Sequence, residues 1–282
     1  MTNKVALVTG SSSGIGYATS LMLARNGFHT YASMRQPDKS QGIIDLATSE
    51  GLPLQVIHLD VNDNESVKGA ITKIIAERGR IDILVNNAGY GLAGCVEDLS
   101  MEELRAQFDT NLFGIILVTQ AVLPTMKKQG EGMIVNMSSI VGLVAFPGAP
   151  AYVSTKFALE GLSDAMRFEL EPFGIRVVII EPGLIGTNFR KAMVIAKKAQ
   201  DPNSPYAQFL QKITEGFTAR SENATPADEV AKVILKAVTT ENPEFRYLVG
   251  EDAIKWMEAR KKMSDREFER FVKKGILEHA VQ

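Results

Sequence analysis

Short β-branched runs alternate with longer stretches of helical period from Lys4 to about Gly183, and this alternation constrains the fold more than any other feature. A strand, a crossover helix and a second parallel strand form a right-handed unit, so repeated units predict a parallel sheet with helices on both faces. Several of the runs are apolar throughout, as expected for strands that are buried on both sides. The predicted strands are residues 5–9, 29–33, 54–59, 83–86, 133–137, 177–181 and 245–250.

Helical stretches of about three turns or more separate these strands, which is the length that parallel crossovers require. The predicted helices are residues 17–26, 41–49, 64–77, 101–127, 151–171 and 227–238. No repeat or linker divides the chain, so we expect one domain over residues 1–250, followed by a charged helical extension over residues 251–282 that packs on it. Residues 184–224 match no regular period, and we interpret them as a substrate flap of that domain.

Composition excludes several classes of function. A formal charge of −2 gives no electrostatic signal for nucleic acid or for an anionic membrane surface. Cys95 is the only cysteine and the three histidines lack an HExxH spacing, so neither a disulfide nor a metal centre is expected. Apolar runs end well before about 18 residues, and no secretory segment precedes the first strand. We therefore expect no membrane span and a cytoplasmic location.

A glycine-rich turn, TGSSSGIG over residues 9–16, lies between the first predicted strand and the first predicted helix. Gly10 permits a tight turn, Gly14 lets the backbone approach a pyrophosphate, and Gly16 permits close packing of the helix on the strand. The phosphates would then meet the positive end of the helix dipole. In this context the turn predicts a dinucleotide site, to which Ser12, Ser13 and Ile15 also contribute, rather than a plain connection.

The TGxxxGxG spacing resembles that of the short-chain dehydrogenase/reductase family, and further family-like signals follow in order up to about residue 190. They are Asp60-Val61, Asn86-Asn87-Ala88-Gly89, Asn111, Ser139, Tyr152 with Lys156, and Pro182-Gly183 with Thr187. The resemblance implies a single-domain α/β fold of the Rossmann type, a doubly wound parallel sheet of about seven strands. It also implies that Asp60, next to Val61, binds the adenine amino group. By the same resemblance residues 86–89 line the adenine ribose, and residues 182–187, with Ile185, hold the nicotinamide carboxamide. Each signal alone has a structural explanation, such as a helix cap at Asp60.

The end of the second predicted strand decides between NAD and NADP, because the edge of the adenosine ribose lies there in this fold. An acidic residue would bind both ribose hydroxyls of NAD, but the nearest candidates are Met34 and Arg35. A guanidinium pairs with the 2′-phosphate that a carboxylate would repel. We therefore predict that NADP(H) is preferred and that NAD(H) is possible. The structural alternative is that Arg35 is a solvated loop residue.

Tyr152 and Lys156 are four residues apart at the start of a predicted helix, so both side chains lie on one face. A neighbouring ammonium and the positive ring of an oxidised nicotinamide both favour the phenolate, so Tyr152 is predicted to exchange a proton with the substrate. Ser139 is expected to hydrogen-bond the substrate oxygen. Asn111 is poorly suited to a helix interior, and the resemblance implies that it holds a water linked to the lysine. Tyr152 and Lys156 are also expected to contact the cofactor. The structural alternative is that an ordinary amphipathic helix accounts for the spacing of these two residues.

These residues together predict an NADP(H)-dependent oxidoreductase that transfers a hydride between nicotinamide and a carbonyl or secondary alcohol. The segments that set substrate choice are mostly apolar, which favours an apolar substrate. Their residues are Tyr90, Leu92, Val141, Leu143, Phe146, Pro147, Phe189 and Met193. The segment PEFRYLVGEDA over residues 243–253 is similar to that of hydroxysteroid and retinol dehydrogenases within the family.

The predicted helices at residues 101–127 and 151–171 are apolar on more than one face. The resemblance implies a homodimer or homotetramer formed through them. Two other classes of function stay open. One is a dinucleotide-sensing binding protein with the same fold and little turnover, against which the intact Ser139, Tyr152 and Lys156 argue. The other is an interaction module that uses the C-terminal tail.

Overall fold

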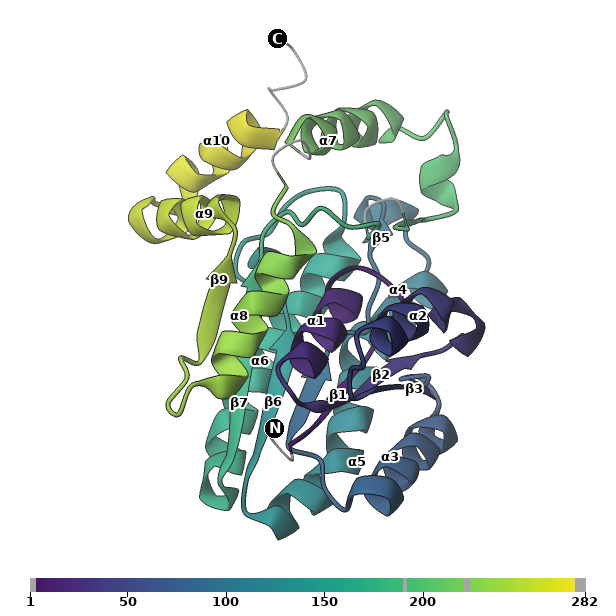
Figure 1. Ribbon diagram of the computed structural model, residues 1–282. Helices are drawn as coiled ribbons and strands as arrows, with labels where there is room; N and C mark the ends of the chain where they lie inside the picture. The colour runs from purple at the N-terminus through teal and green to yellow at the C-terminus, as the bar shows by residue number, and fades with distance from the viewer. Residues whose placement is uncertain (1–3, 190–191, 221–223, 277–282) are drawn as a thin grey trace.

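The computed structural model describes residues 4–189, 192–220 and 224–276. This part of the chain is organised around a seven-stranded sheet in the order β3-β2-β1-β4-β6-β7-β9 (Figure 1). The strands are β1 (Val5–Val8), β2 (His29–Met34), β3 (Leu54–His58), β4 (Ile83–Asn86), β6 (Gly132–Met137), β7 (Ile175–Pro182) and β9 (Arg246–Val249). A second, two-stranded sheet pairs β5 (Leu92–Ala93) with β8 (Val194–Ile195).

All neighbouring strands of the large sheet are parallel. The chain moves outward from β1 through β2 to β3, and then returns to β4 on the other side of β1. A crevice forms at such a reversal, at the carboxyl ends of the two central strands. The predicted α/β fold with a doubly wound parallel sheet is therefore confirmed, with strand ends within two residues of those expected.

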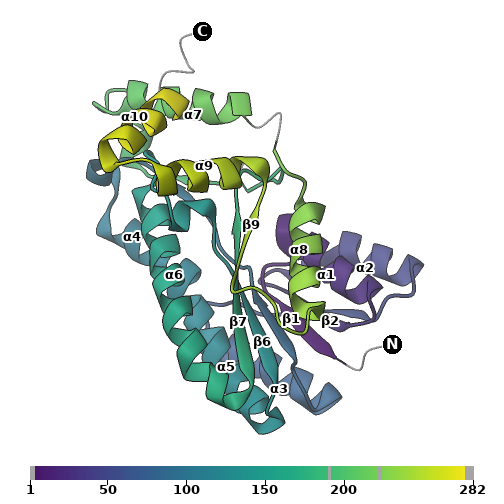
Figure 2. The same cartoon turned by 90° about the vertical axis from the view of Figure 1, so that its left-hand side faces the viewer.

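Helices cover both faces of the sheet, as Figure 2 shows most clearly. The helices α3, α5 and α6 lie on one face, and α1, α2 and α8 lie on the other. The bounds are α1 (Gly14–Arg25), α2 (Gln41–Ser49), α3 (Asn64–Arg78), α4 (Met101–Phe108), α5 (Gly114–Gln129), α6 (Pro150–Leu170), α7 (Ala207–Arg220), α8 (Ala227–Thr239), α9 (Glu251–Lys262) and α10 (Asp265–Ile276).

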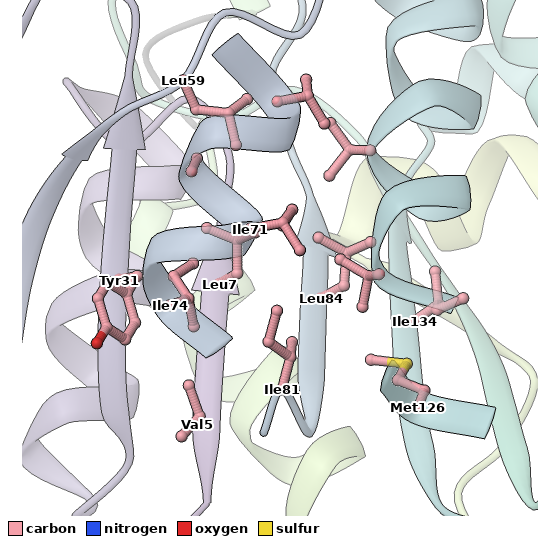
Figure 3. Packing of buried hydrophobic residues seen from close by; sticks show 14 of the residues in the cluster. Val5, Leu7, Tyr31, Leu59, Ile71, Ile74, Ile81, Leu84, Met126 and Ile134 are labelled. Carbon is pink, nitrogen blue, oxygen red and sulfur yellow. The ribbon is translucent and has the colours of Figure 1, made fainter. Parts of the chain in front are cut away.

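The two faces of β1 show why the central strands are apolar throughout. Val5 and Leu7 belong to the core cluster that includes residues of α3 and α5 (Figure 3), whereas Ala6 and Val8 belong to the cluster that includes residues of α1 and α8. Successive side chains of a strand point to opposite faces, so a strand covered on both sides has no position for a polar residue facing solvent. Leu84 and Ile134 continue the first cluster across β4 and β6.

The helix predicted over residues 101–127 contains a wider turn that the sequence did not reveal. Residues Asp109–Phe113 form a π-helical turn between α4 and α5. The chain passes close to the end of β3 here, since a Cβ added to Gly114 would lie 2.8 Å from Val61 Cγ2. Single π turns inside α-helices occur often at functional sites, and this one contains Asn111, which is 1% exposed.

The stretch over residues 184–224 was expected to be irregular, and this expectation is wrong for α7. Apolar residues of α7, among them Leu210, Ile213 and Phe217, pack with α9 and α10 in one cluster around Trp256. These three helices, which we call the helical cap, lie beyond the carboxyl end of β9 (Figures 1 and 2). Residues 190–191 and 221–223 of the expected flap, and 277–282 of the extension, lie outside the described residues.

One helical stretch, Met101–Gln129, has the length and mean hydropathy, 1.2, of a helix that could cross a membrane. Within its most apolar window 39% is buried inside the protein, and α5 packs against α3 and against the sheet. A core helix has the same properties, so this stretch gives no clear indication of a membrane span.

Candidate active site

A cleft of about 1650 Å³ opens at the carboxyl ends of the strands. This volume exceeds the roughly 300–1,000 Å³ of common ligand pockets, so a cofactor and a substrate can lie in it together. The predicted catalytic residues Asn111, Ser139, Tyr152 and Lys156 line it. The other predicted cofactor residues that line it are Gly10, Ser12, Ser13, Gly14, Ile15, Arg35, Val61, Asn87, Ala88, Gly89, Pro182, Gly183, Ile185 and Thr187.

The predicted cofactor residues outside this lining are Gly16, Asp60, Asn86 and Gly186. Asn86 is buried and donates to Thr119 Oγ1 at 3.1 Å and to Asn136 Oδ1 at 2.9 Å, within the core of the sheet. Gly16 packs the helix on the strand as expected, because a Cβ added there would lie 2.4 Å from Gly10 O and from Asn87 Nδ2. The carboxylate of Asp60 accepts a hydrogen bond from the Asn62 N–H at 3.0 Å and so shapes the turn after β3. Its contact with adenine stays a prediction.

The glycine turn forms a cradle whose shape depends on missing side chains. Gly10 and Gly14 have φ values of +69° and +61°, which favour glycine. A Cβ added to Gly10 would lie 2.8 Å from Ala88 Cα. Ser13 precedes α1 without capping it through its side chain, and the first turn of α1 has no acidic residue. The first N–H groups of the helix can therefore meet an anion, and the cradle fits a pyrophosphate.

Thr9 connects this turn to the loop after β4, and sequence reasoning did not single it out. Its Oγ1 accepts hydrogen bonds from the N–H groups of Asn87, at 2.9 Å, and Ala88, at 3.0 Å. The Asn87 amide in turn donates to Thr9 O at 2.8 Å and to Gly10 O at 3.1 Å. The two halves of the cradle therefore support each other, and the TG pair that opens the motif is the only sequence signal for this role.

The loop after β2 contributes two cations to the cleft. Its lining residues are Met34, Arg35, Gln36 and Lys39, and the side chains of Arg35 and Lys39 are both exposed. The sequence identified Arg35 from its position at the strand end. It missed Lys39, because only the 3₁₀ turn Pro37–Ser40 brings this residue back to the same edge.

The structure brings Ser139, Tyr152 and Lys156 together between the ends of β6 and β7. Lys156 Nζ lies 5.6 Å from the centre of the Tyr152 ring and donates to Met137 O at 2.7 Å. Ser139 Oγ donates to Pro182 O at 3.2 Å. The spacing of four residues on α6 and the extended backbone at Ser139 give this arrangement, as the sequence indicated.

Burial disfavours the charged form of both Tyr152 and Lys156. It raises the pKa of Tyr152 to about 12, against which a hydrogen bond with Ser139 acts in the lowering direction. Burial also lowers the pKa of Lys156 to about 8, and the Glu160 carboxylate acts in the raising direction. In the protein alone the net shift in the Tyr152 pKa is therefore upward, because loss of hydration dominates. The effect of the Lys156 ammonium on the phenolate stays a prediction.

Asn111 is held by the loop after β4. Its Nδ2 donates to Tyr90 O at 2.9 Å and to Thr155 Oγ1 at 3.3 Å, and its Oδ1 accepts from the Tyr90 N–H at 3.1 Å. These contacts fix the side chain at the wall of the cleft, next to α6. They explain how a helix tolerates asparagine here, since the amide bonds other segments instead of its own backbone.

The other end of the cleft is apolar. Of the residues expected to set substrate choice, Tyr90, Val141, Phe146, Pro147, Phe189 and Met193 line the cleft. Leu92 and Leu143 instead belong to packed clusters outside the lining. The cap adds lining residues that sequence reasoning missed, namely Leu210, Ile213, Phe217 and Trp256. The only sequence signal for the three residues on α7 is their spacing of three and four residues, and Trp256 lies on α9, within the predicted charged extension.

Hydrogen bonds tie the segment after β7 to residues near α4, and tie the cap to the turn after β7. Tyr206 donates to the Glu97 carboxylate at 2.9 Å, and the Lys197 N–H donates to the Glu103 carboxylate at 2.9 Å. Asp252, at the start of α9, accepts from the Leu184 N–H at 2.7 Å. The turn at Gly183 is therefore positioned by the cap.

The fold and this cleft define a dinucleotide-dependent oxidoreductase. Residues 4–198 match the short chain dehydrogenase family, so the chain belongs to that family. Its relatives include the uncharacterized oxidoreductase YusZ of Bacillus subtilis (strain 168), 40% identical over 256 residues, which are 89% of this chain and 90% of that protein.

Solved structures agree with this assignment. A short-chain dehydrogenase from Streptomyces avermitilis matches with a TM-score of 0.81 at 32% identity, over 100% of this chain and 99% of that one. An alcohol dehydrogenase from the archaeon Thermococcus sibiricus, complexed with 5-hydroxy-NADP, matches with a TM-score of 0.72 at 27% identity. The match covers 87% of this chain and 95% of that one. The protein is an oxidoreductase, as the sequence predicted, of a family that binds NAD(P) and acts on small molecules.

We predict that Gly10→Ala weakens dinucleotide binding at least about tenfold, because positive φ and the contact with Ala88 would push the two halves of the cradle apart. Titration of NADPH fluorescence measures this. Gly42→Ala is the control: nothing lies within 4 Å of its added Cβ, so affinity should stay unchanged. The same change should raise the free energy of unfolding by about 0.5–1 kcal/mol, because alanine stabilises the helix α2 relative to glycine. Unchanged affinity in Gly10→Ala would show that the cradle does not depend on this turn.

Proposed function

We propose that the protein is an NADP(H)-dependent oxidoreductase that transfers a hydride between nicotinamide and the carbonyl or secondary alcohol carbon of an apolar small molecule. One observation carries this proposal: Ser139, Tyr152 and Lys156 converge in a single cleft, between the glycine turn and an apolar wall. The nicotinamide group, when bound, supplies or accepts the hydride. The protein supplies position, proton transfer and a dry environment.

In this proposal the glycine turn and the first N–H groups of α1 hold the pyrophosphate. Residues 87–89 and Val61 line the adenosine half, with Asp60 at its edge. Residues 182–187 hold the nicotinamide half, supported by the hydrogen bond from Leu184 to Asp252. Lys156, whose buried Nζ donates to Met137 O, contacts the cofactor from the side of β6.

Tyr152 donates a proton to the substrate oxygen in reduction and accepts it in oxidation. Ser139 hydrogen-bonds the same oxygen and stabilises the charge that develops there. Lys156 in its ammonium form attracts the phenolate, which offsets part of the cost of burial. Asn111 fixes the wall beside Lys156 and holds a water through which the lysine exchanges protons with solvent.

The cations of the β2 loop support NADP(H) over NAD(H). A 2′-phosphate carries a charge near −2, and Arg35 and Lys39 both line that edge of the cleft. The Thermococcus sibiricus enzyme, with its NADP derivative, agrees with this choice. Each charge-assisted contact contributes about 1.5–3 kcal/mol.

The apolar end of the cleft favours a substrate with a hydrophobic body, held under the helical cap. Residues 1–250 then form the catalytic domain, with residues 184–224 as the substrate flap and residues 251–282 as an extension packed on it. The exposed Phe113, Phe157 and Phe168, on or next to α5 and α6, support a homodimer or homotetramer through these helices. We place the protein in the cytoplasm.

We predict that Tyr152→Phe lowers kcat about 10²–10⁴-fold, since it removes the proton donor, while NADPH affinity stays unchanged. Steady-state reduction of a panel of apolar ketones and aldehydes, with NADPH titrations, checks both parts. Tyr247→Phe on β9 is the control and should keep full activity. Near-native turnover in Tyr152→Phe would disprove the proposed mechanism. Tight NADPH binding by the wild type without any turnover would favour the dinucleotide-sensing alternative.

We predict that Arg35→Ala raises KM for NADPH about tenfold or more and leaves KM for NADH unchanged, because only the 2′-phosphate needs the cation. Lys39→Ala should act in the same direction. Arg266→Ala, an exposed arginine of α10, is the charge-matched control and should change neither value. A wild-type enzyme with higher kcat/KM for NADH would overturn the cofactor assignment.

A further inference from the structure

A second group of charges lies outside the lining of the cleft and begins one helical turn after Lys156. Glu160 of α6 and Glu181 of β7 have side chains only 7% and 1% exposed. Arg246 of β9 joins them, with Nη2 3.2 Å from Glu160 Oε2 and Nε 3.1 Å from Glu181 Oε1. Two buried carboxyl groups on different elements therefore share one guanidinium.

Glu160 is the member of this group next to the catalytic lysine. It follows Lys156 by four residues on α6, so both side chains lie on the same face of the helix. A Cβ added to Gly142 would lie 3.0 Å from Glu160 Cγ, 2.8 Å from Ser138 Oγ and 3.1 Å from Lys156 O. The Cγ of Glu160, the hydroxyl of Ser138 and the backbone carbonyl of Lys156 thus surround Gly142.

Loss of hydration makes it unfavourable to ionise both carboxyl groups of this pair. The pKa of Glu181 is raised to about 8, because burial and the neighbouring Glu160 raise it more than Arg246 and Lys261 of α9 lower it. Burial also raises the pKa of Glu160, which Ser138 and Arg246 lower and Asp164 raises. Because two interacting acids release their protons one after the other, near neutral pH one proton stays on the pair.

We propose that Glu160 is a positioning residue that keeps Lys156 in its ammonium form, and that Glu181 takes up the proton which Glu160 would otherwise hold. The inference rests on the proposed function, in which the charge of Lys156 has a catalytic purpose. Glu160 touches neither substrate nor cofactor in this scheme. It acts by compensating for the loss of hydration at the lysine, and Arg246 keeps it in place.

A direct titration of the lysine tests this without any turnover. The Lys156 side chain is followed by NMR of lysine-labelled full-length protein, and Lys156→Met identifies its signal. In Glu160→Gln we expect the midpoint of Lys156 to move to lower pH, because the compensating charge is gone. In Glu181→Gln, Glu160 is the carboxyl group that is left of the pair, and it stays ionised. The midpoint of Lys156 should therefore stay in place or rise. A downward shift in Glu160→Gln without one in Glu181→Gln cannot come from a general loss of stability, because both changes are isosteric.

Asp164→Asn is the matched control, since Asp164 also pairs with Arg246, at 3.0 Å, but lies a further turn from Lys156 and is 51% exposed. It should leave the midpoint unchanged. The same downward shift in Asp164→Asn, or none in Glu160→Gln, would overturn the inference. If Glu160→Gln does not fold, a downward shift in Glu181→Gln overturns it instead.

The activity profile gives a second readout. A downward shift of about one pH unit from a midpoint near 8 reduces the ammonium fraction at pH 8 about fivefold. The kcat/KM of Glu160→Gln should therefore fall about fivefold at pH 8 and much less at pH 6.5. If the wild type reduces no carbonyl compound with NADPH, the proposed function fails, whereas the NMR titration still decides whether Glu160 controls the charge of Lys156.

Discussion

The close approach of β1 to the loop after β4 is the constraint on which the rest of the site depends. Gly10 lies so near to Ala88 that no side chain fits between them, and Thr9 and Asn87 connect the two segments through hydrogen bonds. This contact occurs where the strand order reverses, so it places the start of α1 at the mouth of the crevice. The glycine turn, the helix α6 with Lys156, and the apolar wall of the cleft are then arranged around this contact.

Burial is the second physical constraint, because it opposes the charged forms of the residues to which we assign proton transfer. The low dielectric around Tyr152 and Lys156 favours the neutral phenol and the neutral amine. A reactive phenolate therefore needs positive charge from outside the tyrosine, and a charged lysine needs a nearby carboxylate. Glu160, balanced by Arg246 and Glu181, supplies that carboxylate one helical turn from Lys156, outside the lining of the cleft. The charge of Lys156 thus depends on Glu160 and, through Glu160, on Arg246 and Glu181.

Much of this could be predicted from the sequence because the signals are local. Apolar runs gave the strands, the glycine spacing gave the cradle, and four-residue spacing put Tyr152 and Lys156 on one face. The π turn at Asn111 could not be predicted, since it depends on packing against Val61 and Tyr90. Lys39 was missed because the local 3₁₀ turn Pro37–Ser40 brings it to the cleft. Trp256 and the pair of Glu160 with Arg246 were missed for the same reason as the π turn. They meet the site only through tertiary contacts between segments that are distant in the chain.

The most direct test of this account is the ionisation of Tyr152 itself, followed by the ultraviolet absorbance of the phenolate with Tyr152→Phe as reference. In the protein alone the midpoint should lie at about 12, where burial puts it. With saturating NADP⁺ we expect it to fall by several pH units, because the positive ring compensates for the buried negative charge. An unchanged midpoint with NADP⁺ bound would contradict the claim that this tyrosine is the proton carrier.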